Sequence, residues 1–217
     1  MNLGAFILDL LFPSRCVFCG KLLKGGERDY CMQCQRELPW IEGKEAEQKF
    51  DFVSMCVSPL WFRDHVRESI HRYKFSDRNG YATCYGKLLA QCVEDHLSDK
   101  FDLITWVPLS KKRLRKRGYD QAMLLAMATA LELNDIAVET LRKVFDTSAQ
   151  SNINDDAMRR ANILGAYEAV DSTLIEGKRI LLIDDVVTTG STLSECARTL
   201  LTAGASDVVC ATLSKAR

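Results

Sequence analysis

The spacing of apolar residues predicts an α/β domain in residues 41–217. Apolar residues recur at helical spacing in three segments, at residues 63–97, 119–133 and 191–203. Short, nearly continuous apolar runs occupy three others, at residues 101–108, 179–185 and 208–213. Runs of this kind are typical of strands that are covered on both faces. Their alternation with helices predicts a parallel sheet flanked by helices.

Weaker patterns lie between these segments. Short strands are predicted at residues 52–60, 138–144 and 166–170. The strands at 101–108 and 138–144, joined by a basic loop and a helix, would form a βαβ unit. We expect residues 42–48 to be a polar linker. Residues 145–160 are polar and have no period, so we expect a long functional loop there.

The first part of the chain differs in character, and we interpret residues 1–40 as a separate module. Its opening apolar residues predict a short helix that ends at the first proline. Two Cys-x-x-Cys pairs follow, formed by Cys16 with Cys19 and by Cys31 with Cys34. Four thiolates fit a closed, structural zinc site, and iron is the alternative metal. The eleven residues between the pairs are fewer than is usual in zinc ribbons.

Composition favours a globular protein from a reducing compartment. Hydrophobic residues make up 47% of the 217 positions, which excludes the disordered and fibrous classes. Nine cysteines, four of them in Cys-x-x-Cys pairs, favour a metal over a disulfide framework, and the other five fit buried apolar positions. No apolar run approaches the roughly 20 residues that a membrane helix needs. We therefore expect a cytoplasmic protein without a membrane span.

Charge is balanced over the whole chain but concentrated in one place. Twenty-nine basic and 29 acidic residues cancel, so affinity for a polyanion must come from a local patch. Residues 111–117 hold six cations in seven positions. This patch suits either a pyrophosphate or a nucleic-acid backbone, beside which Tyr119 could stack on a base. Arg117, next to the turn at Gly118, is the best single candidate for a catalytic cation.

A strand that ends in two carboxylates is the strongest candidate for a binding site. Asp184 and Asp185 end the strand at 179–185, where ligands of open α/β sheets bind. A turn rich in hydroxyl groups leads into the next helix, at Thr188, Thr189, Gly190, Ser191 and Thr192. Backbone N–H groups at a helix start favour a phosphate, and carboxylates accept hydrogen bonds from vicinal hydroxyls, so a ribose 5-phosphate fits. Both carboxylates reach one sugar only if the chain turns out of the sheet near Asp185.

This segment has two other interpretations. Nucleoside triphosphatases also carry an apolar strand that ends in aspartates. No Gly-Lys pair here is followed by Ser or Thr, however, which excludes the phosphate-binding loop of that class. The aspartates could also serve only as caps and the glycine only as a turn. The order of strand, acidic pair, turn and helix favours the binding site.

The segment ILLIDDVVTTGST resembles the 5-phosphoribosyl 1-pyrophosphate (PRPP) motif of type I phosphoribosyltransferases. The chain from Cys16 to Leu213 resembles the competence-protein ComF (GntX-like) family. The resemblance implies a type I phosphoribosyltransferase-like parallel sheet flanked by helices, with a small N-terminal zinc-ribbon module that binds its metal through four cysteines. Residues 1–40 would be the module and residues 41–217 the phosphoribosyltransferase-like domain.

The same resemblance assigns roles to residues of the predicted site. Asp184 and Asp185 would bind the ribose hydroxyls, and the turn at 188–192 would bind the 5-phosphate. Residues 107–122, with Ser110, Lys111 and Arg117, would bind pyrophosphate together with magnesium. A flexible loop over the site would include Gln150, Arg159 and Asn162. Thr188 stands where purine-salvage members carry an acidic residue, so a general base there is unsupported.

Three functions follow from the resemblance. The first is an enzyme that binds magnesium and PRPP and transfers or releases the phosphoribosyl group. The second is a non-catalytic factor in DNA uptake during natural transformation, with single-stranded DNA or the uptake machinery as partner. The third is a PRPP-sensing regulator. The sequence leaves open the acceptor, the retention of catalysis and the oligomeric state.

Overall fold

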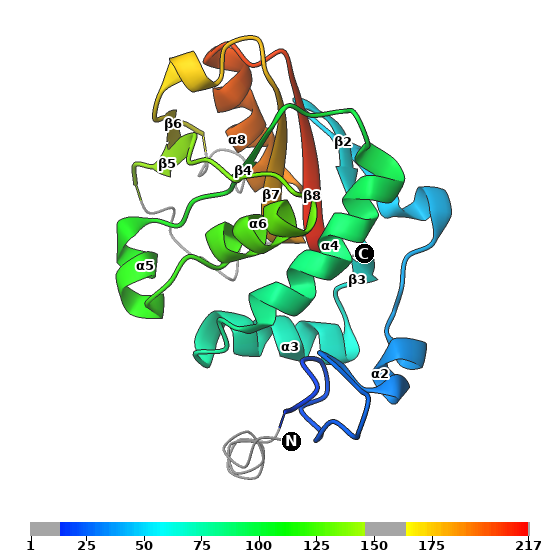
Figure 1. The fold of residues 1–217 in the computed structure, drawn as a ribbon. Helices are drawn as coiled ribbons and strands as arrows, with labels where there is room; N and C mark the ends of the chain where they lie inside the picture. Colours follow the sequence, from blue (N-terminus) through cyan, green and yellow to red (C-terminus); the bar gives the residue numbers. More distant parts are fainter. Residues whose placement is uncertain (1–13, 146–163, 217) are drawn as a thin grey trace.

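The computed structural model describes residues 14–145 and 164–216. They form a six-stranded sheet with helices on both faces (Figure 1). The strand order is β1-β2-β8-β7-β4, and β3 pairs with β8 beside β2. The bounds of these strands are β1 Glu47–Phe50, β2 Val53–Val57, β3 Leu60–Trp61, β4 Leu103–Trp106, β7 Arg179–Val187 and β8 Asp207–Lys215. Two further strands, β5 Leu141–Lys143 and β6 Tyr167–Ala169, pair with each other in a separate antiparallel sheet.

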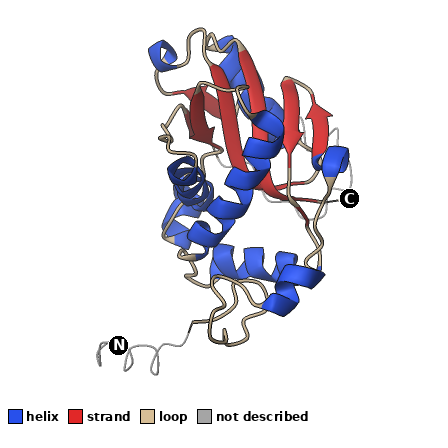
Figure 2. Cartoon of the chain, turned by 45° about the vertical axis from the view of Figure 1, so that its right-hand side comes forward, coloured by secondary structure: helices blue, strands red, loops and turns tan. Residues whose placement is uncertain are grey.

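The helices are α2 Met32–Glu37, α3 Asp64–Phe75, α4 Tyr81–Leu97, α5 Lys111–Arg117, α6 Gln121–Glu132 and α8 Ser191–Thr202, with 3-10 turns η1 Gly43–Ala46 and η2 Ser172–Leu174. Helices α3, α4, α6 and α8 occupy the segments that the apolar spacing predicted, whereas α2 and α5 do not. Helices α4 and α6 cover one face of the sheet and α8 the other (Figures 1 and 2). None of the helices in the described ranges has both the length and the apolar composition needed to cross a membrane.

Alternation along the central strand gives each face its own core. On β7, Leu181 packs in the cluster that includes Leu125 of α6, and Leu182 packs in the cluster that includes Leu193 of α8. All four leucines are 2% exposed or less, and full burial of a leucine contributes roughly 1.5–3 kcal/mol. The period-2 geometry of a strand therefore covers β7 on both sides, as its continuous apolar run predicted.

The centre of the sheet is parallel, but its edge is not. Strands β2, β8, β7 and β4 run parallel, whereas β1 is antiparallel to β2. The prediction of a linker at residues 42–48 is therefore wrong, because η1 and the start of β1 occupy it. The cause is tertiary packing, since Ala46 is buried and Phe50 packs against Gly190. No local pattern encodes these contacts.

The basic stretch at 111–117 is a helix rather than the predicted loop. Ser110 Oγ accepts a hydrogen bond from the Arg113 N–H at 3.3 Å, and Gly118 ends α5 with φ 85°. A serine N-cap and a left-handed glycine are strong helix boundaries, and they outweigh the repulsion between cations that water screens. The predicted βαβ unit is also incomplete. Only Ala137 forms a parallel bridge with Ile104, while β5 joins β6.

Some predicted features lie outside the described residues. These are the helix before Pro13, most of the loop at 145–160, and the loop residues Gln150, Arg159 and Asn162. The boundary predicted near residue 40 stays a prediction. Side chains of the cysteine-rich segment, such as Phe18 and Leu38, share one apolar cluster with the domain that follows.

Candidate functional site

The two aspartates lie on opposite faces of β7. β7 does not turn out of the sheet at Asp185: Asp184 pairs with Thr212, Val186 pairs with Ser214, and the strand continues to Val187. The turn that would bring both carboxylates to one sugar is therefore absent. Asp184 Oδ1 accepts a hydrogen bond from the Asp185 N–H at 2.8 Å, so the Asp184 carboxylate lies along the backbone toward the next residue. The pair stays close although the faces differ.

A lysine that the sequence did not single out pairs with Asp185. Lys74 Nζ lies 2.7 Å from Asp185 Oδ2, and Asp185 is 3% exposed. Helix α3 holds Lys74 there because the Tyr73 hydroxyl donates to the Gln121 carbonyl at 2.8 Å, and the Tyr119 hydroxyl donates to the Tyr73 carbonyl. Lys74 lies near the end of a helix of mixed polarity, and no local pattern distinguishes it from a surface lysine.

Burial and charge alter the ionisation of this cluster. Burial raises the pKa of Asp184 well above its ordinary value, and the neighbouring Asp185 carboxylate raises it further while Lys74 opposes the shift. Burial lowers the pKa of Arg117, although Asp185 acts in the opposite direction. An arginine remains charged under such a shift. The free site therefore holds two cations near Asp185, with a proton retained on Asp184 to higher pH than usual.

The turn after β7 leaves an open helix start. Gly190 precedes α8 with φ 76° and, as a glycine, offers no side chain to cap the helix, although the Ser191 N–H donates a long hydrogen bond of 3.5 Å to Thr189 Oγ1. A Cβ at this position would collide with the Phe50 ring, so only glycine fits both the space and the backbone. Thr189 Oγ1 and Ser191 Oγ lie 2.9 Å apart. Free N–H groups, hydroxyls and the helix dipole together favour an anion.

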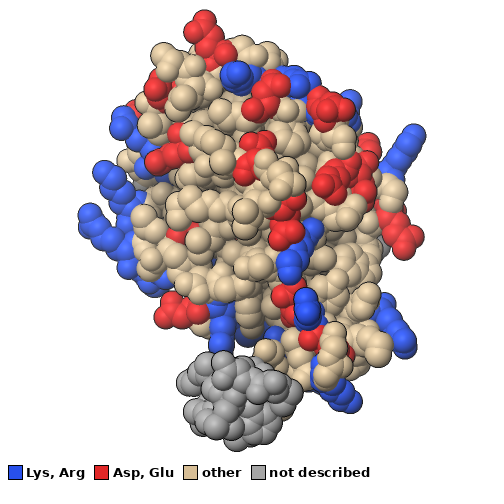
Figure 3. All heavy atoms as spheres, viewed as in Figure 1, with Lys and Arg blue, Asp and Glu red and all other residues tan. Residues whose placement is uncertain are grey.

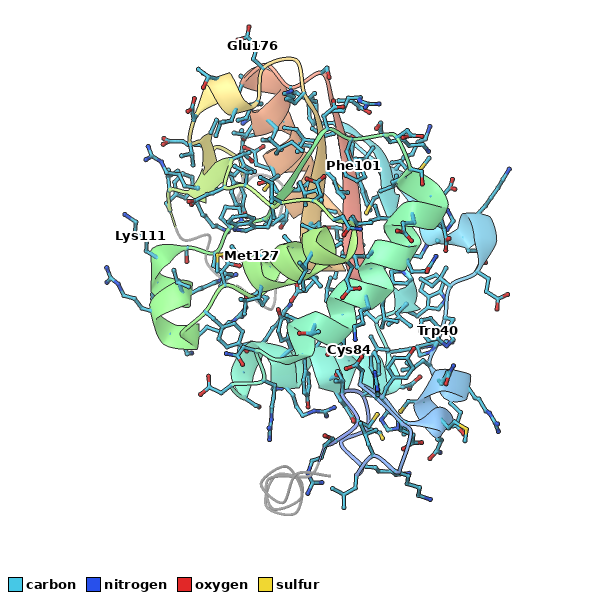
Figure 4. The ribbon with its side chains drawn as sticks, in the orientation of Figure 1. Trp40, Cys84, Phe101, Lys111, Met127 and Glu176 are labelled. Carbon is cyan, nitrogen blue, oxygen red and sulfur yellow. The ribbon has the colours of Figure 1, made fainter. Side chains whose placement is uncertain are left out.

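The predicted pyrophosphate residues do not gather at one point. Ser110 is buried and its hydroxyl caps α5, whereas Lys111 is exposed and points away from the sheet (Figure 4). Among Ser110, Lys111 and Arg117, it is Arg117 whose pKa the nearby Asp185 charge raises. The roles of Ser110 and Lys111 stay predictions.

A large basic cleft opens beside α5. Its volume is about 1070 Å³, and its lining includes the apolar side chains of Trp106 and Met123. Six cations line it, namely Lys111, Lys112, Arg115, Lys116, Arg142 and Lys143. Figure 3 shows Lys and Arg side chains gathered along the edge of the molecule over α5. Within the described ranges, no cation of α5 forms an ion pair, and an unpaired cationic surface of this kind suits a polyanion.

The four cysteines of the first module form a metal-binding cluster. The Sγ atoms of Cys16, Cys19, Cys31 and Cys34 all lie within 4.8 Å of one another, and those of Cys19 and Cys31 lie 3.7 Å apart. Ligands about 2.3 Å from a zinc ion at tetrahedral corners have this separation, so the donor set fits zinc. Burial raises the pKa of the Cys16 thiol, but N–H donors from Cys19 and Cys31 outweigh this and lower it to about 7. The other five cysteines are buried, as expected.

The module is docked on α3 through backbone contacts. Arg72 Nη2 donates to the carbonyls of Val17 and Phe18 at 3.1 and 2.5 Å, and Ser69 Oγ donates to the Val17 carbonyl at 2.6 Å. Phe18 is fully buried and packs against Tyr85. Figures 1 and 2 both place this segment next to α3. One helix thus joins the metal cluster to Asp185.

Comparison with known proteins places these features in a family. A double zinc ribbon domain matches residues 7–45, and a phosphoribosyl transferase domain matches residues 120–217. The DNA utilization protein YhgH of Salmonella typhi is 31% identical over 90% of this chain and 81% of its own length. The chain belongs to the competence-protein ComF family. Competence protein F of Haemophilus influenzae, a further ComF relative, is 28% identical over 91% of this chain and 95% of its own length.

A solved structure gives a more distant match for the ComF chain. Glutamine PRPP amidotransferase from B. subtilis, complexed with ADP and GMP, matches with a TM-score of 0.45 and 20% identity. The match covers 65% of this chain and 30% of that one, so the ComF chain spans about a third of that enzyme. The family matches confirm a phosphoribosyltransferase-type α/β fold with an N-terminal four-cysteine zinc-binding cluster.

Proposed function

We propose that this ComF protein binds PRPP with magnesium where β7 ends and α8 begins. The observation that carries the proposal is a helix that starts at a glycine N-cap in a hydroxyl-rich turn, directly after a strand with two carboxylates. The 5-phosphate would accept hydrogen bonds from the turn at 188–192. Asp184 and Asp185 would both accept hydrogen bonds from the ribose hydroxyls although β7 does not turn, because the Asp184 carboxylate lies along the backbone toward Asp185. Such charge-assisted hydrogen bonds are roughly twice as strong as neutral ones.

Magnesium would arrive with the ligand. Among the residues that the structure describes, only the cysteine cluster groups three or more metal-binding side chains closely enough for a metal. Magnesium keeps several waters and binds through one or two carboxylates and the phosphates of a substrate. Asp184 and Asp185 supply that number of carboxylates. The bound ion would neutralise charge on the pyrophosphate group.

If the protein is an enzyme, it acts on the bond between ribose C1 and pyrophosphate. Arg117 is the residue of the basic segment best placed for the leaving group, since it is half-buried near Asp185 and stays charged. The carboxylates would orient the sugar ring. A regulator that senses PRPP would use the same contacts without this step, so turnover separates the two functions.

A second candidate function is the binding of single-stranded DNA. The unpaired cations of α5 and the basic cleft favour it, and the names of the relatives, competence protein F and DNA utilization protein, connect the family with DNA. Backbone contacts from Lys and Arg carry no sequence information. The DNA would therefore bind along α5 without sequence preference. We also propose that the protein is cytoplasmic, where it would meet DNA that has been taken up.

Substitution of the carboxylates tests the PRPP proposal. Asp184→Asn and Asp185→Asn remove the charged acceptors with almost no change in shape, and we expect each to weaken PRPP binding at least tenfold in calorimetric titration with magnesium. Asp207→Asn is the matched control. Asp207 lies at the opposite end of the parallel strands and accepts a hydrogen bond from Ser54. Unchanged affinity in both site variants would overturn the proposal.

A further inference from the structure

The turn that would bind the 5-phosphate has an aromatic ring packed against it. Phe50, the last residue of β1, lies so close to Gly190 that a Cβ at position 190 would lie 2.6 Å from Phe50 Cγ. Gly190 also has φ 76°, a conformation that favours glycine. Because protein interiors are close-packed, the turn cannot shift toward β1 unless the ring moves as well.

The same ring packs against the core on both sides of the turn. Phe50 is half-buried and packs against the apolar cluster that includes Val187, at the end of β7, and Leu193, in the first turn of α8. Val187 and Leu193 are both 2% exposed. Residues 188–192 connect these two positions. The ring therefore belongs to the packing that fixes the turn relative to the strand before it and the helix after it.

An irregularity in the pairing of β1 with β2 sets the direction of this ring. Gln48 pairs with Cys56, but the register shifts before Phe50, which pairs with Val53. Shifts of this kind are typical of β-bulges, which redirect a side chain and are common next to active sites. The shift falls directly before Phe50, so it turns that side chain and not the rest of the strand toward Gly190.

The start of β1 is fixed to two other elements. Glu47 Oε1 lies 3.1 Å from His96 Nδ1 of α4, and Lys215 Nζ, at the end of β8, donates to the Glu45 carbonyl just before β1. The edge strand is thus held by α4 and β8 at one end and contacts the turn at the other. Its position is set by the rest of the domain and not by the turn.

We propose that Phe50 is a positioning residue of the PRPP site, whose ring holds the turn at 188–192 in the conformation that binds the 5-phosphate. This inference rests on the proposed function and extends it by giving the edge strand a part in ligand binding. Phe50 acts through Gly190 and does not contact the ligand. Several N–H groups must point at one phosphate at the same time, so a small displacement of the turn lowers the affinity.

The alternative role for Phe50 is only to bury apolar surface at the edge of the sheet. Its loss would then destabilise the chain and weaken every ligand alike. A positioning role affects only the group that the turn binds. Ribose 5-phosphate and pyrophosphate separate the two roles, because the turn at 188–192 would bind the phosphate of the first, whereas Arg117 would bind the second.

Calorimetric titration of the full zinc-loaded chain with each ligand, in the presence of magnesium, gives the test. We expect Phe50→Ala to weaken the binding of ribose 5-phosphate about tenfold and to leave that of pyrophosphate within about twofold. Phe50→Leu keeps most of the volume, so it should weaken ribose 5-phosphate only about threefold. If Phe50→Ala does not fold, Phe50→Leu shows the same selective loss at this smaller size.

Phe52→Ala is the matched control. Phe52 lies two positions further along the chain and is 53% exposed, whereas the three heavy atoms nearest to a Cβ at Gly190 all belong to Phe50. Its removal takes away the same kind of ring without opening space at the turn. We expect both affinities of this variant to stay within about twofold of those of the unmodified chain. Thermal unfolding of each variant shows that it is folded.

Three results would overturn the inference and leave the proposed function intact. The first is an unchanged affinity for ribose 5-phosphate in both Phe50 variants. The second is an equal loss of affinity for ribose 5-phosphate and pyrophosphate, which would mean that Phe50 contributes only stability. The third is a selective loss in Phe52→Ala as large as that in Phe50→Ala. Failure of the unmodified chain to bind PRPP would instead contradict the proposed function, and the inference with it.

Discussion

The molecule carries two sets of cations whose surroundings differ sharply. The first set consists of Lys111, Lys112, Arg115 and Lys116 of α5, which are exposed and form no ion pair within the described chain. Those near the end of β7 are partly buried: Lys74 pairs with Asp185, and Arg117 lies over the Phe75 ring. We call them the exposed set and the embedded set. Their charges are alike, but their solvation is not.

Solvation decides what each set can recognise. Exposed cations act through a field that salt screens over about 8–10 Å, so they hold any polyanion without much selectivity. Embedded cations have lost water and have fixed partners, so they favour a ligand that matches their geometry. We therefore propose DNA as the ligand of the exposed set and PRPP as the ligand of the embedded set. Each prediction below acts mainly on one of the two sets.

Removal of zinc is expected to have the largest effect, and to act mainly on the embedded set. The module contacts α3 through Arg72 and Ser69, and α3 carries Lys74. Because metal binding supplies the folding energy of such small modules, chelation should unfold the cysteine segment and weaken PRPP binding at least tenfold. Calorimetry before and after chelation measures this, and added zinc should restore the affinity. Retained PRPP affinity in the metal-free chain would show that α3 is positioned without the module.

Neutralising the exposed set should change DNA binding and its salt dependence. We expect Lys112→Gln, Arg115→Gln and Lys116→Gln together to weaken oligonucleotide binding roughly a hundredfold at low salt. The slope of log affinity against log salt should fall by about 2, since each lost contact to a single strand removes about 0.7. Fluorescence anisotropy over a salt series measures both. An unchanged slope would remove α5 from the DNA surface.

Breaking the buried ion pair should destabilise the fold. Lys74→Met leaves the Asp185 carboxylate buried without its partner, at a cost of about 3 kcal/mol in the free energy of unfolding. Urea unfolding followed by circular dichroism measures it. The double variant Lys74→Met with Asp185→Asn should recover most of this loss, because no unpaired charge remains. Equal losses in the single and double variants would mean that the pair contributes only packing.

The smallest expected effect is the release of protons on binding. Burial raises the pKa of Asp184 in the free protein, so the folded chain keeps this proton to higher pH than an ordinary aspartate. Ribose hydroxyls and magnesium favour the ionised carboxylate, so PRPP binding should release up to one proton and strengthen as pH rises through the raised pKa. Titration in buffers of different ionisation enthalpy counts the protons. Asp184→Asn should abolish the release, and proton uptake would contradict the assignment.

Local signals in the sequence account for much of the fold. The run at 179–185 corresponds to β7, and the spacing at 191–203 corresponds to α8. The two Cys-x-x-Cys pairs converge as their spacing predicted. Each of these signals is a short pattern in the sequence. A continuous apolar run indicates a strand buried on both faces, a helical repeat indicates a helix, and a Cys-x-x-Cys pair indicates a metal ligand pair.

Contacts between distant segments account for what the sequence did not predict. Lys74 reaches Asp185 from more than a hundred positions away, and Phe50 covers Gly190 from the edge of the sheet. The helix at 111–117 departs from the prediction for another reason. Its boundaries are local, at Ser110 and Gly118, and these two capping residues prevail over the mutual repulsion of the cations between them.

The most direct test of the central claim is calorimetric titration of the zinc-loaded chain with PRPP and magnesium. A single-stranded oligonucleotide would then be titrated at two salt concentrations. We expect saturable PRPP binding with little dependence on salt, and oligonucleotide binding that weakens steeply as salt rises. Oligonucleotide binding without any PRPP binding would contradict the account, because the end of β7 would then be a scaffold and not a ligand site.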